Sequence, residues 1–314
     1  MAAEVDALVD TRGEALRERL SRVEARLREI AAEAAPPLDR LAGDTIAAGG
    51  KRLRPLLVLL AATDPPADDA GLIRAAVAVE LVHSATLVHD DVLDAAALRR
   101  GRPTVWATAG RDGAIAAGDY LFARAFAELA ANGRVDEVAV LSDASSALAH
   151  GELLQREDAF DAGVAIERYL WRCELKTARL FEAACRLGAL ECGGPAEELG
   201  LFGRRIGLAF QLLDDVLDVS GPPERTGKPR GTDLLDGTVT LPFILARERD
   251  PSLRDARPTT PQEAEAVCDR IAATGALDAA RERALEIVAD AKAGLPWPDP
   301  ALELVADGVV ARYA

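Results

Sequence analysis

The stretch AAVAVELVHSATLVHDDVLD, residues 75–94, decides how the rest of the chain is interpreted. Its first fourteen residues, 75–88, form a largely apolar run rich in alanine, valine and leucine. Alanine and leucine favour helix, so we predict a buried helix here. The stretch ends in the pentapeptide Asp-Asp-Val-Leu-Asp, residues 90–94, which places three carboxylates at the end of that helix.

The same pentapeptide occurs again at residues 214–218, after a second apolar run at 206–213. Side chains four residues apart on a helix lie on one face, with Cβ atoms roughly 5–6 Å apart. The first and fifth residues of each copy therefore project together, and the second lies about one step around the helix. The predicted metal-binding residues are Asp90, Asp91, Asp94, Asp214, Asp215 and Asp218.

Carboxylates paired in this way repel each other, by about 0.3 kcal/mol on a helix, and the helix dipole adds to the cost at a C-terminal end. One acidic triplet is typical of a solvated helix end, but two identical triplets after apolar runs indicate a cation site. Hard oxygen ligands with no cysteine beside them suit Mg²⁺, which binds one or two carboxylates together with water and substrate phosphates. The pattern therefore predicts a phosphorylated ligand.

Basic residues lie where such a ligand needs them. The sequence GGKRLRP, residues 49–55, opens a predicted helix, RRGRPT follows the first acidic triplet at 99–104, and Lys228 lies in a Gly- and Pro-rich loop after the second triplet. Backbone N–H groups at a helix start and Lys or Arg side chains form anion sites. No Walker A, GxGxxG or GxSxG motif is present, which disfavours nucleotide hydrolysis and serine-hydrolase chemistry.

The composition of the 314 residues excludes other classes. Lys and Arg number 37 against 52 Asp and Glu, so the net charge is −15, which argues against non-specific nucleic-acid binding and against a polybasic membrane anchor. A hydrophobic share of 49% argues against disorder. The four cysteines include no CxxC pair and there are three histidines, so we expect buried thiols in a reducing compartment rather than a zinc site.

We expect a soluble, cytoplasmic protein, because residues 1–30 lack the apolar core of a signal peptide and no apolar run reaches the length of a membrane span. Hairpin signals are scarce, and we predict one all-α domain over 1–314 with a long loop at 220–231. The predicted helices cover 5–33, 36–48, 52–62, 68–95, 110–131, 134–157, 163–188, 194–220, 236–249, 261–273, 276–293 and 299–313.

The chain resembles the trans-isoprenyl diphosphate synthases, or polyprenyl synthetases, through motifs that follow one another in the family's order. They are GGKRLRP (49–55), ELVH (80–83), the first aspartate motif with its trailing RRG (90–101), GDYLFARAF (118–126), GELLQ (151–155), KTA (176–178), FQLLDDVLD (210–218), Gly227-Lys228, Asp233 and TLP (240–242). Any one motif is weak, but their ordered succession is specific.

The resemblance implies an all-α bundle around a central cavity, with the two acidic motifs facing each other, and a homodimer. It implies three Mg²⁺ ions and two substrates, isopentenyl diphosphate and an allylic diphosphate, which condense to a chain five carbons longer. It assigns isopentenyl diphosphate to Lys51, Arg54, His83 and Arg100, and the allylic diphosphate to Arg99, Lys176 and Lys228. Thr177 and Gln211 would place oxygens near the allylic cation, which makes them, with Lys176, the implied catalytic residues, and Phe210 would flank the alkenes.

Simpler interpretations exist for some of these side chains. On spacing alone, His83 is a core histidine, and Lys176 is a lysine whose stem lies along an apolar helix face. His89 and His150 are interpreted as structural. The chain also departs from the family at Thr238, where a lysine is common, which leaves Arg230 as a possible substitute, and at Trp106, where asparagine is common.

Product length in this family depends on side-chain bulk just before the first aspartate motif. Thr86 and Ala85 are small here, with Val82 one turn further back. These positions form the floor of the hydrophobic tunnel in the family. Small side chains there leave room for a longer apolar chain, so the resemblance predicts a product longer than three or four isoprene units. Phe122 and Phe126 are the next candidates for the floor, or ordinary core aromatics.

Two alternatives remain. A class I terpene cyclase uses the same ionisation, but its second metal motif differs and it needs no isopentenyl site. A non-catalytic subunit of a hetero-oligomeric synthase is the other alternative, although such subunits usually lose motif residues and all six carboxylates are present here.

Overall fold

The computed structural model describes residues 11–65, 68–221 and 229–311, and within them the chain is almost entirely helical. The chain folds into two compact units, which we describe separately. The all-α prediction is confirmed, and the single domain over 1–314 stays a prediction.

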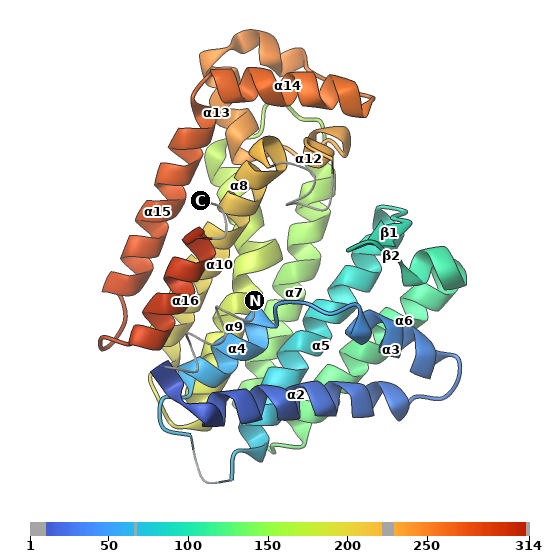
Figure 1. Cartoon of the computed structure of the whole chain (residues 1–314), viewed down its shortest axis with the longest axis vertical. Coiled ribbons are helices and arrows are strands. Elements are labelled where there is room, and N and C mark those ends of the chain that lie inside the picture. The colour runs from blue at the N-terminus through green and yellow to red at the C-terminus, as the bar shows by residue number, and fades with distance from the viewer. Residues whose placement is uncertain (1–10, 66–67, 222–228, 312–314) are drawn as a thin grey trace. The chain divides into compact units, whose positions relative to one another are not determined.

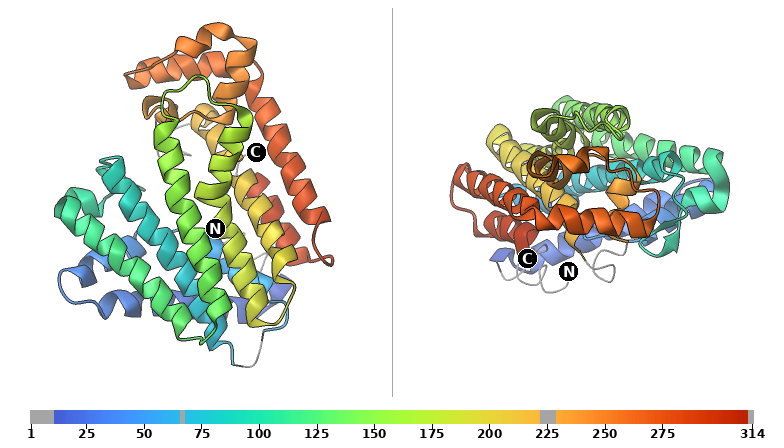
Figure 2. Two further views of the ribbon diagram at one scale, coloured as in Figure 1. Left: turned by 180° about the vertical axis from the view of Figure 1, so that it is seen from behind. Right: turned by 90° about the horizontal axis from the view of Figure 1, so that it is seen from above.

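The first unit comprises residues 1–145, 180–200 and 296–302. Its helices are α2 (Glu14–Ala32), α3 (Leu38–Ala47), α4 (Leu53–Ala61), α5 (Ala70–Leu93), α6 (Val105–Ala130), the first part of α7 (Val135–Glu157) and most of α9 (Arg179–Glu191). Helices α5 and α6 lie side by side in Figures 1 and 2, and α4 packs against α5. α5 is therefore the central helix of this unit, buried from Leu72 to Val88 on most of its surface.

α5 is the one helix, among the residues described, that is long and apolar enough to cross a membrane. Of its most apolar window, 72% is buried inside the protein, as in the core helix of a soluble protein. Because alanine and valine leave little bulk on its surface, neighbouring helices approach α5 closely, and this packing accounts for its apolar sequence.

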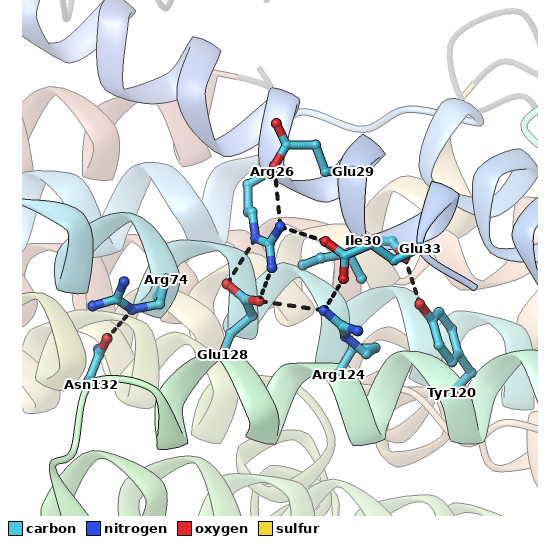
Figure 3. A network of polar contacts seen from close by, with 9 residues as sticks. All are labelled: Arg26, Glu29, Ile30, Glu33, Arg74, Tyr120, Arg124, Glu128 and Asn132. Atoms are coloured by element: carbon cyan, nitrogen blue, oxygen red, sulfur yellow. Dashed lines mark hydrogen bonds and ion pairs between the residues drawn. The ribbon is translucent and has the colours of Figure 1, made fainter. Parts of the chain in front are cut away.

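Polar contacts fix α2 against α6 in the same unit (Figure 3). Arg26 binds Glu128 through two nitrogens at 2.7 and 3.3 Å and also contacts Glu29 and Glu33. The Tyr120 hydroxyl donates to the Ile30 carbonyl at 2.6 Å. Hydrogen bonding to the buried Glu128 carboxylate raises the pKa of Arg26, so the guanidinium stays charged and the helices stay joined.

The second unit comprises residues 146–179, 201–295 and 303–314. It contains the end of α7, α8 (Ile166–Cys173), a π-helical turn (Glu174–Ala178), most of α10 (Ala196–Ser220), α12 (Thr232–Leu235), α13 (Leu241–Arg249), a 3₁₀ turn (Pro251–Asp255), α14 (Pro261–Ala273), α15 (Ala276–Ala293) and the end of α16 (Pro300–Ala311). α13 packs against α14 and α15.

Most predicted helices are found within a few residues of their expected ends, but three predictions were wrong in detail. The helix expected from 110 begins at Val105, because the Thr104 hydroxyl caps it by accepting from Ala107 N, and it breaks at Gly110. The helix expected over 163–188 contains the π-helical turn. The helix expected from 236 begins only at Leu241, since Gly237 has a φ of +75°.

The fourth difference is a small hairpin, β1 (Leu98–Arg99) and β2 (Arg102–Pro103), which we did not predict. Both turn residues have positive φ, +52° at Arg100 and +74° at Gly101, which is the backbone that a tight two-residue hairpin requires. Of the cysteines, Cys173, Cys185 and Cys268 are buried and Cys192 is half-buried, all as free thiols.

Candidate active site

The first aspartate motif lies at the C-terminal end of α5, in the first unit. Asp91 is buried, with 5% of its surface exposed, and accepts from Arg99 Nε at 2.8 Å. Burial raises the pKa of Asp91, and the Arg99 guanidinium opposes that effect. Asp90 is half-buried and Asp94 is exposed. Asp90 and Asp94 thus present carboxylates one turn apart, while Asp91 faces inward.

Arginines gather near this motif. Arg52 begins α4 in a left-handed conformation, with φ +48°, and binds Glu24 at 2.5 Å and the buried Glu80 at 2.7 Å. Arg54, two residues on, lies over the Phe181 ring at 4.7 Å. Burial lowers the pKa of Arg54 to about 10, and Glu80 opposes the shift while Arg100 adds to it.

His83 lies within the field of the same arginines. Burial lowers the pKa of His83 well below its usual range, and the charges of Arg54, Arg100, Arg99 and Arg52 lower it further. His83 is therefore neutral at physiological pH. A site that holds a histidine neutral through nearby arginines has a positive potential, and such a site favours an anion.

The glycine loop before α4 and the hairpin after α5 lie close together. A Cβ atom on Gly50 would lie 3.0 Å from an Arg100 nitrogen, so only glycine leaves that guanidinium its full space. Lys51 is exposed on the same loop. The structure thus brings together Arg54, His83, Arg99 and Arg100 of the predicted set, with Lys51 on the adjoining loop.

The second group of predicted residues lies in the second unit and forms one hydrogen-bond series. Thr177 Oγ1 donates to Gln211 Oε1 at 2.7 Å, and Gln211 Nε2 donates to Asp215 Oδ1 at 2.7 Å. The fully buried Tyr169 hydroxyl donates to the other Asp215 oxygen at 2.6 Å. Lys176, which adjoins Thr177 in the π-helical turn, forms an ion pair with Glu152.

Asp215 is the buried member of the second aspartate motif. Burial and the charge of Asp233 raise its pKa to about 8, while the bonds from Tyr169 and Gln211 oppose the shift. Asp214 is exposed and Asp218 is half-buried, and Asp218 Oδ2 accepts from Asp233 N at 3.3 Å. The two motifs therefore share one arrangement, in which the second aspartate is buried and the first is more exposed.

These carboxylates suit Mg²⁺ as a group. Within the described ranges no cluster of three or more His, Cys, Asp or Glu side chains could hold a metal ion by itself. Mg²⁺ needs no such cluster, because it takes one or two carboxylates and completes its shell with water and substrate phosphates. Asp90, Asp94 and Asp214 are more exposed than Asp91 and Asp215, so their oxygens are more accessible to a metal ion from solvent.

Some predictions cannot be placed or acquire other partners. Lys228 lies outside the described residues, and Phe210 is half-buried on α10. Arg230, considered above as a substitute for the missing lysine at Thr238, donates to the Val219 carbonyl at 2.9 Å and to Asp269 at 3.0 Å. Its guanidinium is thus directed onto α10 and α14.

The predicted chain-length residues lie on the facing sides of α5 and α6. Val82 and Ala85 are fully buried, and the Thr86 hydroxyl donates to the His83 carbonyl at 2.8 Å. One turn on, His89 stacks on Phe122 with ring centroids 5.8 Å apart. Phe126, one turn further along α6, is half-buried.

Sequence reasoning missed four residues of the site. Glu80 and Arg52 belong to quoted motifs but received no role, although they form a buried ion pair beside Arg54. Tyr169 belongs to no motif, and no sequence signal pointed to its bond with Asp215. Glu152 was quoted only as part of the GELLQ motif, and no role was predicted for it.

An all-helical protein with two paired aspartate motifs, an arginine cluster and a Lys-Thr pair belongs to the class of enzymes that act on prenyl diphosphates. Residues 35–273 match the model of the polyprenyl synthetase family. The chain belongs to this family and is a prenyltransferase.

Relatives and solved structures agree with this assignment. The chain is 43% identical over 230 residues to heptaprenyl diphosphate synthase component 2 of Geobacillus stearothermophilus, covering 72% of each chain. It is 36% identical over 314 residues to geranylgeranyl diphosphate synthase of Methanosarcina mazei, covering 95% of this chain and 97% of the relative. Among crystal structures, polyprenyl synthase from Caulobacter crescentus, complexed with calcium and isoprenyl diphosphate, matches with a TM-score of 0.90 at 37% identity, covering 99% of this chain and 98% of the other.

Proposed function

We propose that this chain is an Mg²⁺-dependent synthase that condenses isopentenyl diphosphate with an allylic diphosphate to give a medium- to long-chain, all-trans polyprenyl diphosphate. The observation that carries the proposal is the arginine cluster around the neutral His83, beside the first aspartate motif. Such a concentration of positive charge in an otherwise acidic chain supports a site for highly charged diphosphates.

Isopentenyl diphosphate would bind in the first unit, to Lys51, Arg54, His83 and Arg100. Arg54 is preoriented by the Phe181 ring. The neutral His83 can donate one N–H without adding charge, while the arginines supply the positive field. Glu80, which is paired with Arg52, also stabilises the charged form of Arg54, because its negative charge raises the proton affinity of the buried guanidinium.

When bound, Mg²⁺ ions, three by family resemblance, neutralise the diphosphate leaving group and align it. Asp90, Asp94 and Asp214 would bind metal directly, and Asp91, Asp215 and Asp218 through water. Arg99, Lys176 and Lys228 would hold the allylic diphosphate by their charges.

The reaction breaks the allylic C–O bond, and the diphosphate leaves with the electron pair. The double bond of isopentenyl diphosphate attacks the allylic cation to form a C–C bond, and a proton is then lost to the released diphosphate. Thr177 donates its only hydroxyl hydrogen to Gln211, so the lone pairs of its oxygen remain for the developing positive charge. This arrangement supports a cation-stabilising role for Thr177.

We propose a product longer than four isoprene units, on the basis of the small side chains of Ala85 and Thr86. The relatives are named for products of different length, so the proposal rests on the residues of α5. We further propose a cytoplasmic homodimer without stable membrane insertion. One relative is named as a synthase component, which makes activity of the single chain the deciding observation.

The test is to incubate the purified chain with Mg²⁺, isopentenyl diphosphate and, in turn, dimethylallyl, geranyl, farnesyl and geranylgeranyl diphosphate, and to measure product masses. We expect a series spaced by five carbons that disappears when EDTA replaces Mg²⁺. A hydrocarbon product would favour the cyclase. No product with any starter would favour a non-catalytic subunit, and light scattering of the same sample gives the oligomeric state.

A further inference from the structure

The GELLQ motif at 151–155 has no role in the mechanism above, yet it touches the site. A Cβ atom on Gly151 would lie 2.5 Å from Lys176 N and 2.9 Å from Lys176 Cα. No side chain fits between α7 and the π-helical turn at this point. The backbone that carries Lys176 therefore rests directly on the backbone of α7 at Gly151.

The next residue engages the Lys176 side chain. Glu152 Oε2 forms an ion pair with Lys176 Nζ, and Glu152 Oε1 accepts from Arg156 Nε at 2.9 Å. The carboxylate is thus held from both sides, and 13% of the Glu152 side chain is exposed. Although burial opposes ionisation, the charges and hydrogen bonds of Lys176 and Arg156 lower the pKa of Glu152, so this carboxyl group is ionised at neutral pH.

The pair leaves Lys176 able to bind a second anion. An ammonium group has three N–H donors, and Glu152 Oε2 accepts from one direction only. A free lysine side chain loses about 2 kcal/mol of rotamer entropy when it is fixed, and Glu152 removes most of that loss before the substrate arrives. Lys176 also lies in a π-helical turn, a feature that is frequent at functional sites.

We infer that Gly151 and Glu152 are positioning residues, which hold the backbone and the ammonium group of Lys176 ready for the diphosphate of the allylic substrate. This inference rests on the proposed function, since it needs Lys176 to bind that substrate. It gives the GELLQ motif a physical role that is separate from both aspartate motifs.

The test is a double-mutant cycle on the KM for the allylic substrate. In the wild-type background, Glu152→Gln removes the ion pair and should raise this KM about tenfold, since charge-assisted bonds are roughly twice as strong as neutral ones. The KM for isopentenyl diphosphate should change less than about twofold. In a Lys176→Gln background, adding Glu152→Gln should change neither constant further, because Glu152 acts through Lys176.

A matched control is Glu157→Gln. Glu157 lies on α7, like Glu152, but is exposed and forms an ion pair with Arg168, so its substitution should leave both KM values unchanged. If Glu152→Gln does not fold, Glu152→Asp, whose carboxylate is one methylene shorter, replaces it in the cycle. Equal effects of the Glu152 substitution in both backgrounds, or equal rises in both KM values, would overturn the inference. An inactive wild-type chain would instead refute the proposed function.

Discussion

A buried glutamate in the first unit, Glu137, should make the stability of the protein fall as pH rises. Glu137, on α7, has no exposed surface, and Asn132 Nδ2 bridges Glu137 Oε2 at 2.9 Å and Glu191 Oε1 at 3.0 Å. Burial, the hydrogen bond to Glu191 and the charge of Glu191 raise the pKa of Glu137 to about 8, with Asn132 and Arg134 opposing. The Glu137 carboxyl group therefore keeps its proton at neutral pH and can use it in the hydrogen bond to Glu191.

The direction of this pH dependence follows from the proton affinity of Glu137 in the folded and the unfolded state. The unfolded chain releases the Glu137 proton near its ordinary pKa of 4.5, while the folded chain keeps it up to about pH 8. Stability is then fully present below pH 4.5 and decreases as pH rises toward 8. At about 1.4 kcal/mol for each pH unit, Glu137 makes the folded state about 2–3 kcal/mol less stable at pH 8 than at pH 6.

The perturbation is Glu137→Gln, which keeps the shape, donates a hydrogen bond to Glu191 and does not titrate. Urea unfolding from pH 5.5 to 8.5 should give the variant a flatter profile, with the wild type losing about 2–3 kcal/mol more between pH 6 and 8. Other titrating groups are common to both proteins and cancel in the difference.

Asp136→Asn is the neighbouring control. The hydrogen bond from Arg134 lowers the pKa of Asp136, so this carboxylate is ionised throughout the range and its loss should shift the profile without changing its slope. Parallel plots of unfolding free energy against pH for the wild type and Glu137→Gln would refute the conclusion that folded Glu137 keeps its proton at neutral pH.

Three further predictions concern packing and the site. Gly188→Ala should destabilise the protein by at least about 3 kcal/mol in urea unfolding, because its Cβ would overlap the Val58 carbonyl oxygen, whereas Gly43→Ala, with open space around it, should not. Ala85→Phe should shorten the product in the mass assay, and an unchanged product distribution from the folded variant would contradict the pocket assignment. Tyr169→Phe should cost about 1–3 kcal/mol of unfolding free energy and lower kcat, since it removes one of two donors to the buried Asp215, and a wild-type kcat would contradict its role.

The helices of the fold were predictable because their signals are local. The apolar run of α5 and the Pro and Gly residues at the helix boundaries can be recognised in short stretches of the sequence. The π-helical turn Glu174–Ala178 was not, because its sequence contains no helix breaker. The turn lies against Gly151, 25 residues away in the sequence, where α7 comes into backbone contact with Lys176. The hairpin at Arg100 and Gly101 was missed because only Gly101 favours a positive φ.

The site was predictable in part for the same reason. A helix turn brings Asp90 toward Asp94 whatever the tertiary structure, so the carboxylate pairs follow from spacing. Which aspartate is buried does not follow from spacing, because Arg99 and Tyr169 select Asp91 and Asp215 through packing. The metal roles of all six aspartates stay predictions until metal binding is measured.

The net charge of −15 and a site for diphosphates are compatible because charge acts over short distances. At physiological ionic strength, exposed charges more than about 8 Å apart hardly affect each other. Around His83, four arginines lie near the carboxylates of Glu24, Glu80 and Asp91, and burial together with the arginine charges lowers the pKa of that histidine. The acidic surplus elsewhere on the surface acts without reaching this cluster. The sign of the site is thus set by the start of α4 and the hairpin after α5, which together supply all four guanidinium groups.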